Sequence, residues 1–131
     1  MSVENNKRIV QKFYDAGNRG DMDTCFGLIS DDIIWTNIGT TSLSGTFTGK
    51  QEMMEKLIGP LLGQLKQGIH TTLQRLVAEG DYVVAHTSGS AETIEGQPYN
   101  NTYVWIIRLR DGKFAELTEF MDTELANATF K

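Results

Sequence analysis

Residues 99–122, YNNTYVWIIRLRDGKFAELTEFMD, have the pattern of two extended strands joined by a hairpin-length turn. The turn contains Asp111-Gly112, a pair that favours the tight loops between antiparallel strands. Side chains alternate along a strand, so Leu117, Glu119 and Met121 fall on one face of the second strand. The hairpin indicates an antiparallel sheet, and it places an acid between two apolar residues on one face.

Two more extended runs come before this hairpin. They are IHTTLQRLVAE, residues 69–79, and YVVAHTSGSAET, residues 82–93, and Gly80-Asp81 separates them. The turn-forming run of residues 95–98, EGQP, leads from the second run into the hairpin. Together these runs predict an antiparallel meander of four strands in the second half of the chain.

The first half of the chain has helical periodicity. A first amphipathic helix is expected over residues 3–18, with one face formed by Ile9, Val10, Phe13 and Gly17. Asp21 can cap a second, short helix. The extended run IIWTNI follows, and Trp35 and Asn37 share a face of that strand.

Residues 39–49, GTTSLSGTFTG, are rich in glycine and hydroxyl side chains and are expected to form a loop. A third helix follows, with an apolar stripe that includes Leu61. Gly59-Pro60 should kink or divide this helix, because proline cannot donate to the carbonyl four residues earlier. Helices grouped ahead of the sheet indicate a single α+β domain over residues 1–131.

Charge and composition exclude several classes of function. The chain has 12 Lys+Arg against 17 Asp+Glu, and the basic residues form no stripe, so no nucleic-acid partner is expected. No apolar run is long enough to span a membrane, and MSVENNKRIV lacks the apolar core of an export signal. We therefore expect a cytoplasmic protein without a membrane partner.

Cysteine and histidine are scarce. The single cysteine, Cys25, excludes an internal disulfide and a cysteine metal cluster, and its helical context predicts a buried thiol. The two histidines, His70 and His86, have no acid at ligand spacing, so no metal site is expected. His70 is expected at the surface or the rim of a site.

The order of elements resembles the nuclear transport factor 2-like superfamily. The resemblance rests on GDMDTCFGLISDDIIW early, SGTFTGKQEM before the third helix and DGKFAELTEFMD at the end, and it covers essentially the whole chain. The superfamily includes ketosteroid isomerases, limonene-epoxide hydrolases and SnoaL-like polyketide cyclases, and the chain is most similar to uncharacterised ketosteroid-isomerase-related proteins. The resemblance implies a cone-shaped α+β barrel, in which a curved, mostly antiparallel sheet wraps around helices and encloses an apolar pocket. It also implies a homodimer through the outer face of the sheet.

The resemblance can be followed at single positions. Alignment with ketosteroid isomerases puts Asn37 at the general-base aspartate, Phe13 at the oxyanion-hole tyrosine and Trp105 at its partner acid. An amide cannot take a proton at neutral pH, a phenyl ring cannot donate, and an indole donates only through one N–H. Ketosteroid isomerisation is therefore not expected.

In the alignment with epoxide hydrolases, this chain retains part of the water-activating site of those enzymes. Asn37 matches the asparagine, Trp35 replaces the tyrosine, and Glu119 falls on or near the aspartate base. His86 and Ser88 lie where the arginine and the acid would be, and neither matches. The proton donor in such a site would be His86 or Tyr103.

These considerations predict a site on the concave face of the sheet. Its catalytic candidates are Glu119, Asn37 and His86. Its substrate-binding candidates are Phe13, Trp35, Ser88, Tyr103, Trp105, Leu117, Met121 and Leu61. Large aromatic residues with a few polar groups suit a small apolar ligand. Burial would raise the pKa of Glu119, whereas a nearby charged His86 would lower it, and the sequence leaves the balance open.

Three functions remain open from the sequence. The first is a cofactor-independent isomerase, cyclase or epoxide-hydrolase-like enzyme with Glu119 as the base. The second is a module that binds a small apolar molecule without converting it. The third is a dimeric interaction module that uses the exposed face of the sheet. The structural alternatives are a Glu119 that only bonds its neighbours and a His86 in the core or at a dimer face.

Overall fold

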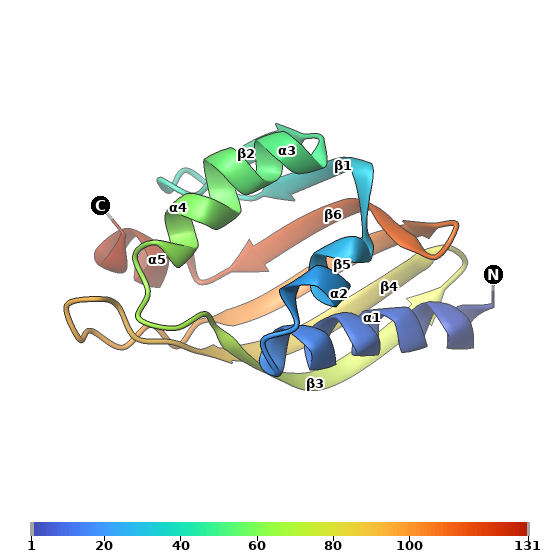
Figure 1. The fold of residues 1–131 in the computed structure, drawn as a ribbon, viewed down its shortest axis with the longest axis horizontal. Coiled ribbons are helices and arrows are strands. Elements are labelled where there is room, and N and C mark those ends of the chain that lie inside the picture. Colours follow the sequence, from blue (N-terminus) through green and yellow to red (C-terminus); the bar gives the residue numbers. More distant parts are fainter. Residues whose placement is uncertain (1, 131) are drawn as a thin grey trace.

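The predicted meander forms most of the sheet (Figure 1). The computed structural model describes residues 2–130. Its meander consists of β3 (His70–Glu79), β4 (Tyr82–Ser90), β5 (Thr102–Arg110) and β6 (Lys113–Met121), each antiparallel to the next. Asp111 and Gly112 have φ values of 52° and 75°, as the two central residues of a tight hairpin turn require. The meander and this turn are confirmed.

Two strands from the first half of the chain complete the sheet. Strand β1 (Ile29–Asn37) pairs in parallel with β6, and β2 (Gly45–Thr48) pairs antiparallel with β1. The order across the sheet is β2-β1-β6-β5-β4-β3. The prediction of a loop over residues 39–49 was wrong for β2, where the alternating threonines and Phe47 favour an edge strand over a solvated turn.

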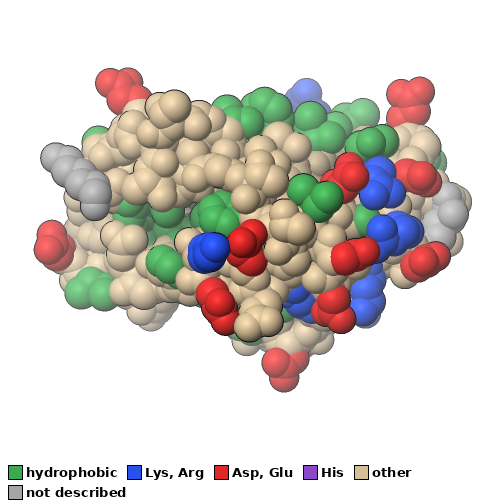
Figure 2. Space-filling model, turned by 90° about the horizontal axis from the view of Figure 1, so that it is seen from above, with side chains coloured by type: hydrophobic (Ala, Val, Ile, Leu, Met, Phe, Trp, Pro, Cys, Tyr) green, Lys and Arg blue, Asp and Glu red, His purple; other side chains and the backbone are tan. Residues whose placement is uncertain are grey.

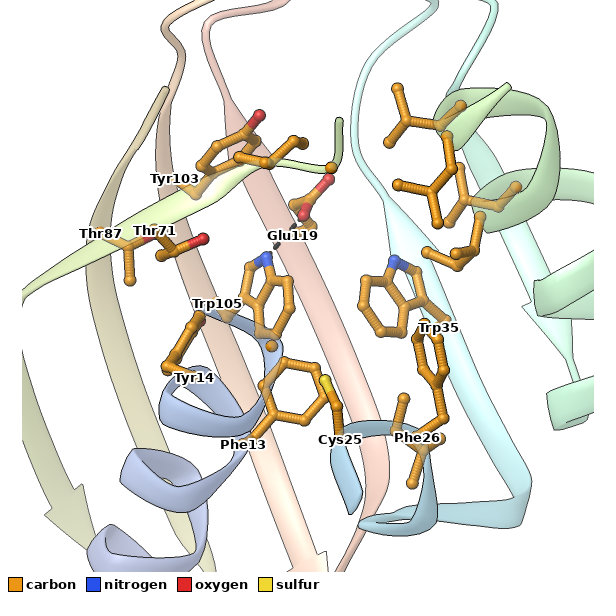
Figure 3. A pocket seen from close by; sticks show the side chains of 18 of the residues that line it. Phe13, Tyr14, Cys25, Phe26, Trp35, Thr71, Thr87, Tyr103, Trp105 and Glu119 are labelled. Carbon is orange, nitrogen blue, oxygen red and sulfur yellow. Dashed lines mark hydrogen bonds between the residues drawn. The ribbon is translucent and has the colours of Figure 1, made fainter. Parts of the chain in front are cut away.

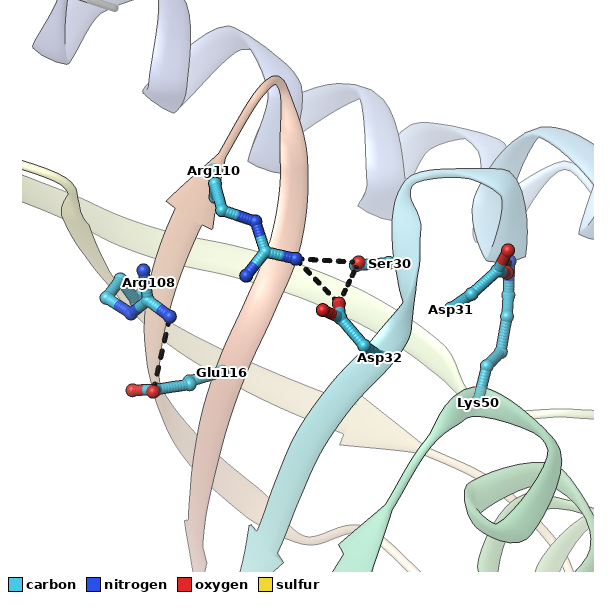
Figure 4. Close-up of polar contacts among 7 residues, drawn as sticks. All are labelled: Ser30, Asp31, Asp32, Lys50, Arg108, Arg110 and Glu116. Carbon is cyan, nitrogen blue, oxygen red and sulfur yellow. Dashed lines mark hydrogen bonds and ion pairs between the residues drawn. The ribbon is translucent and has the colours of Figure 1, made fainter.

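Strand β1 has an irregular start (Figure 4). Ile29 pairs with Phe114 and Ile34 with Glu116, so the intervening residues of β1 bulge out of the ladder. Arg110 of β5 bonds two residues of the bulge, Asp32 at 2.6 Å and Ser30 at 3.2 Å. These contacts are exposed and add little stability. They show how the bulge is bridged to the neighbouring hairpin.

The N-terminal helices pack on the concave face as predicted. Helix α1 (Val3–Asn18) is capped by Ser2, whose Oγ accepts from the backbone N–H of Asn5 at 3.1 Å. Helix α2 (Met22–Gly27) is capped by Asp21, which accepts from the N–H of Thr24 at 3.1 Å. Both helices lie in front of the sheet in Figure 1. The sheet is curved, and its edge strands β2 and β3 do not meet, so the cone is an open α+β structure and not a closed barrel.

The third helix is divided, as Gly59-Pro60 predicted. Its segments are α3 (Lys50–Met53), the wider π-helical turn η1 (Met54–Ile58) and α4 (Gly59–Leu62). A Cβ on Gly59 would lie 2.9 Å from the carbonyl oxygen of Met54, so this turn requires glycine. The three segments run beside β1 and β2 at the edge of the sheet (Figure 1).

A short C-terminal helix, α5 (Thr123–Thr129), was not predicted. Asp122 caps it by accepting from the N–H of Leu125 at 3.2 Å. After the helix, Phe130 packs edge-on against Tyr99 with the ring centroids 4.6 Å apart. Helix α5 and Phe130 thus cover the core near the start of β5.

Candidate functional site

A cavity lies between the concave face of the sheet and the helices. Its volume is about 190 Å³, less than the roughly 300 Å³ or more of the pockets that drug-sized ligands usually occupy. Its walls are mostly aromatic and aliphatic, with Phe26, Leu57, Ile58 and Leu61 coming from the helices. Among residues 2–130, Glu119 is the only charged side chain in the lining. The cavity suits a molecule of one or two rings.

Glu119 projects into this cavity from the centre of the sheet (Figure 3). Its strand β6 lies between β1 and β5, so it pairs in register with Asn37 on one side and Trp105 on the other. Trp105 Nε1 donates to Glu119 Oε2 at 2.5 Å. Protein atoms surround the Glu119 carboxyl, and the part of the side chain that stays accessible faces the cavity.

The surroundings of Glu119 shift its pKa towards neutrality. Burial raises the pKa from 4.5 to about 7, although the hydrogen bond from Trp105 acts in the opposite direction. Burial dominates because the indole supplies one donor, whereas a carboxylate in water is solvated on all sides. At neutral pH both the acid and the carboxylate are populated, so Glu119 can accept a proton and return it.

Trp105 is held in place by other aromatic rings. Its ring centroid lies 5.6 Å from Phe13, 5.4 Å from Tyr14 and 5.1 Å from Trp35. The contact with Trp35 is edge-to-face, an arrangement that the ring quadrupoles favour. This packing fixes the direction in which the Trp105 N–H points, and therefore the position of the carboxyl that it bonds.

Asn37 lies beside Glu119 in the ladder, but its amide is engaged elsewhere. Asn37 Oδ1 accepts from Trp35 Nε1 at 2.7 Å, and its Nδ2 donates to the carbonyl of Leu43 at 2.8 Å. The residue is 3% exposed. These bonds hold the loop after β1 and orient the second indole of the wall, so Asn37 acts on the shape of the cavity.

Tyr103 supplies a hydroxyl near the acid. It sits on β5 opposite Met121 of β6 and Thr87 of β4. Burial, followed by the nearby Tyr99 and Glu119, raises the pKa of Tyr103 above its ordinary value, so the phenol stays protonated and can donate. Gly89 makes room for it, since a Cβ there would lie 2.8 Å from Tyr103 Cε2.

His86 and Ser88 do not face the cavity, and their predicted placement was wrong. In the β4–β5 ladder Thr87 stands opposite Tyr103, and side chains of paired residues share a face. Thr87 therefore points inward. His86 and Ser88, its two neighbours along the strand, point to the outer face. His86 cannot serve as the proton donor to a molecule in the cavity. His70 is exposed, as expected.

Leu117 is the third predicted contact that the structure corrects. It shares the concave face with its ladder partner Trp35, but other core side chains cover it, so it is 1% exposed and does not reach the cavity lining. The cavity does bring together the other predicted residues, which are Phe13, Trp35, Asn37, Leu61, Tyr103, Trp105, Glu119 and Met121.

Several lining residues were missed from the sequence, above all Tyr14 and Thr87. The signal for Tyr14 was available, since Val10, Phe13, Tyr14 and Gly17 follow the i, i+3, i+4, i+7 spacing of one helical face. Thr87 could have been found from the small residues that alternate with it, because Ala85 and Gly89 are buried on the same face.

Cys25 also lines the cavity, as a buried thiol. Burial, with a smaller contribution from Asp21, raises its pKa to about 11, so the reactive thiolate is not populated at neutral pH. Within residues 2–130 no group of three His, Cys, Asp or Glu side chains is arranged to hold a metal ion.

Two features concern nucleic-acid and membrane partners: the charges on the surface and the apolar character of the helices. On the face shown in Figure 2, acidic and basic side chains are intermixed at one end of the view, without a continuous basic stripe. In the described part of the chain, no helix combines the length and apolar character needed to cross a membrane.

The chain can now be compared with known proteins. A family model described as the SnoaL-like domain matches residues 10–117, most of the chain. The chain belongs to the SnoaL-like family. The sequence analysis named this family among those that the chain resembles, and the resemblance is confirmed. Comparison with curated proteins gives no match.

Solved structures agree with the family. Bal32a from a soil-derived mobile gene cassette superposes with a TM-score of 0.86 at 20% identity, covering 98% of both chains. An NTF2-like protein of unknown function from Burkholderia pseudomallei gives 0.85 at 19% identity, over 100% of this chain and 99% of that one. TerC, co-crystallised with polyporic acid, gives 0.81 at 20% identity, over 95% and 97%. At these identities the similarity shows the nuclear transport factor 2-like fold.

Proposed function

We propose that this protein takes a small, largely apolar molecule into the cavity and that Glu119 moves a proton to or from it. Isomerisation, cyclisation and opening of an epoxide by water are reactions of this kind that need no cofactor. The observation that carries the proposal is the placement of one carboxyl, with its pKa raised to about 7, in a wall that has no other charged side chain among residues 2–130. Such a pKa is optimal for proton transfer at neutral pH.

The residues around Glu119 suggest a division of roles. The carboxylate would take a proton from carbon or from water, and the acid would return it to another atom of the same molecule. Tyr103 would donate a hydrogen bond to an oxygen on which negative charge develops. Trp105 would keep the carboxyl in place, and Asn37 would hold the adjoining wall through Trp35 and Leu43.

The test compares Glu119→Gln with the wild type on a panel of monocyclic epoxides and β,γ-unsaturated cyclic ketones, with products followed by mass spectrometry. A substrate of the wild type should be converted at least about 100-fold more slowly by the variant. Glu116→Gln is the matched control, because Glu116 lies on the same strand but pairs with Arg108, at 3.2 Å, outside the cavity. Equal turnover by the wild type and Glu119→Gln would refute the role of the acid.

Binding without conversion is the second candidate function. It is favoured by the engagement of the Asn37 amide with Trp35 and Leu43 and by the outward position of His86. Among residues 2–130, the cavity lining therefore holds no second charged group beside Glu119. TerC, of similar structure, was crystallised with polyporic acid. Thermal stabilisation by panel compounds that are recovered unchanged would support this function over catalysis.

We also propose a homodimer through the outer face of the sheet. Ile34, Ile106 and Phe120 point outward from β1, β5 and β6 and are 43%, 37% and 38% exposed. Ile106 and Phe120 are diagonal neighbours on β5 and β6, whereas Ile34 lies beside Glu116. Exposed apolar residues on one face of a sheet favour an interaction surface. Ile106→Lys should convert a dimer to a monomer in analytical sedimentation. Ile94→Lys is the control, since Ile94 is 61% exposed but lies outside the strands. A wild type that sediments as a monomer would contradict the proposal.

A further inference from the structure

We infer that the hydroxyl of Tyr14 is a second ligand-binding group, which hydrogen-bonds an oxygen of the molecule held in the cavity. The inference rests on the proposed function of the cavity and adds to it the chemical class of the ligand. That ligand has an apolar body of one or two rings and carries two oxygen functions, one for Glu119 and one for Tyr14.

The main observation is a buried polar atom that lacks a partner. Tyr14 is 5% exposed and lines the cavity, and among residues 2–130 no group completes a hydrogen bond with its hydroxyl oxygen. A phenol can both donate and accept, and nearly all buried groups of this type are bonded in folded proteins. Since the ring faces the cavity, an oxygen of a bound molecule can supply the missing bond.

Tyr14 and Glu119 both contact the side chain of Trp105. The indole of Trp105 bonds Glu119 through Nε1, and its ring packs against Tyr14 with the centroids 5.4 Å apart. In Figure 3 Tyr14 lies on the side of Thr71 and Thr87, below Glu119. Since Tyr14, Trp105 and Glu119 line the same cavity, one molecule bound there can contact both polar groups.

The electrostatics of the cavity agree with a neutral oxygen function at Tyr14. Burial, followed by the influence of Glu119, holds the pKa of Tyr14 well above its ordinary value, so the group remains a phenol. Among residues 2–130 the lining contains no Lys, Arg or His to balance a ligand anion. Hydroxyl, ketone and quinone oxygens fit this setting better than carboxylates.

A purely structural role for Tyr14 is the alternative. Thr87 lies next to the Tyr14 hydroxyl, although the two do not reach hydrogen-bonding geometry. If Thr87 were the true partner, both residues would contribute to folding stability through the same bond. If the partner is the ligand, the free protein gains nothing from the hydroxyl.

The first experiment follows from this difference and needs no ligand. Tyr14→Phe removes the hydroxyl and keeps the ring, so the free variant should melt at the same temperature as the wild type or higher. Thr87→Val and the double variant are measured beside it. If Tyr14→Phe and Thr87→Val each lowered the melting temperature and the double variant lowered it no further, the Tyr14–Thr87 bond would exist and the inference would be overturned.

The second experiment measures binding of naphthalene, 2-naphthol and a set of dihydroxynaphthalene isomers by calorimetry. At least one diol should bind the wild type roughly five- to tenfold more tightly than 2-naphthol, as one additional hydrogen bond provides. Tyr14→Phe should lose this preference and still bind naphthalene with wild-type affinity. If Tyr14→Phe kept the preference, the inference would fail and the proposed function would stand. If the wild type bound none of these compounds, the proposed function would fail and the inference with it.

Discussion

Trp105 on β5 donates a 2.5 Å hydrogen bond from its indole nitrogen to Oε2 of Glu119, its register partner on β6. The bond stabilises the carboxylate, whereas burial stabilises the acid, and the two effects together set the pKa of Glu119 at about 7. Trp105, a residue of the cavity wall, therefore influences the protonation of Glu119, the only charged lining residue among residues 2–130.

Replacing Trp105 by phenylalanine should raise the pKa of Glu119 above 7, because the variant loses the donor and keeps an apolar ring. A hydrogen bond to a charged group contributes about 1.5–3 kcal/mol, which corresponds to a rise of about one to two units. The pKa can be measured by NMR titration of the carboxyl carbon. Trp35→Phe is the matched control, since the Trp35 N–H bonds Asn37. A pKa that stayed at the wild-type value in Trp105→Phe would show that this bond has no influence.

Folding stability should depend on pH through Glu119. The pKa of a glutamate in water is 4.5, whereas that of Glu119 in the folded protein is about 7, so the folded state holds the proton more tightly. The stabilising contribution is complete below about pH 4.5 and is lost as the pH rises through 7, with a total of about 3 kcal/mol. Relative to the wild type, Glu119→Gln should gain stability between pH 5 and pH 8 in urea denaturation.

Glu116→Gln provides the reference for this measurement, because it removes an acid from the same strand outside the cavity. Asp21, Asp32 and Glu52 have lowered pKa values and act in the opposite direction at more acidic pH. They are unchanged in both variants, so their effects cancel in the comparison. A difference between Glu119→Gln and the wild type that is independent of pH would contradict a raised pKa.

Asn37→Ala should destabilise the fold by about 2–3 kcal/mol, because it leaves the buried Trp35 N–H and the Leu43 carbonyl without partners. The variant should nevertheless keep the Glu119 pKa near 7, since no hydrogen bond joins the two side chains in the part of the chain that the structure describes. Asn100→Ala, at an exposed asparagine, should change stability by less than about 0.5 kcal/mol. Equal effects of the two substitutions in chemical denaturation would contradict the structural role of Asn37.

Gly89→Ala should cost about 1–3 kcal/mol, because the added methyl would overlap Tyr103 at 2.8 Å and Ile69 at 2.9 Å. The displaced Tyr103 should also weaken ligand binding. Gly27→Ala is the control, since a Cβ there meets nothing within 4 Å and alanine favours the helix. The expected sign of its effect is stabilising. If Gly89→Ala left the melting temperature unchanged, the side chain of Tyr103 would have to move away from β4 at little cost, and the prediction would be wrong.

The fold followed from the sequence because hydrophobic periodicity and turn residues act locally. The Asp111-Gly112 turn, the Asp21 cap and the Gly59-Pro60 break each describe a few neighbouring residues, and all three are present. Strand β2 was missed because its pairing with β1 is what makes it a strand, and composition alone indicates a loop.

The site was predicted less completely because orientation on a strand is not local. Glu119, Trp105 and Tyr103 were placed on the correct face, as their alternation with outward residues is regular. His86 and Ser88 were misplaced because β4 carries short or polar side chains on both faces, so its pattern fits either register. Only the pairing of Thr87 with Tyr103 decides between them.

The two indoles of the wall give the protein a spectroscopic property. The chain contains two tryptophans, Trp35 and Trp105, and both line the cavity in edge-to-face contact. Intrinsic fluorescence therefore comes from the walls of the site and not from distant parts of the molecule. Its wavelength and intensity should respond to filling of the cavity, and the emission of Trp105 should change as Glu119 gains or loses its proton. Unlabelled protein can thus serve as its own optical sensor when compound libraries are screened.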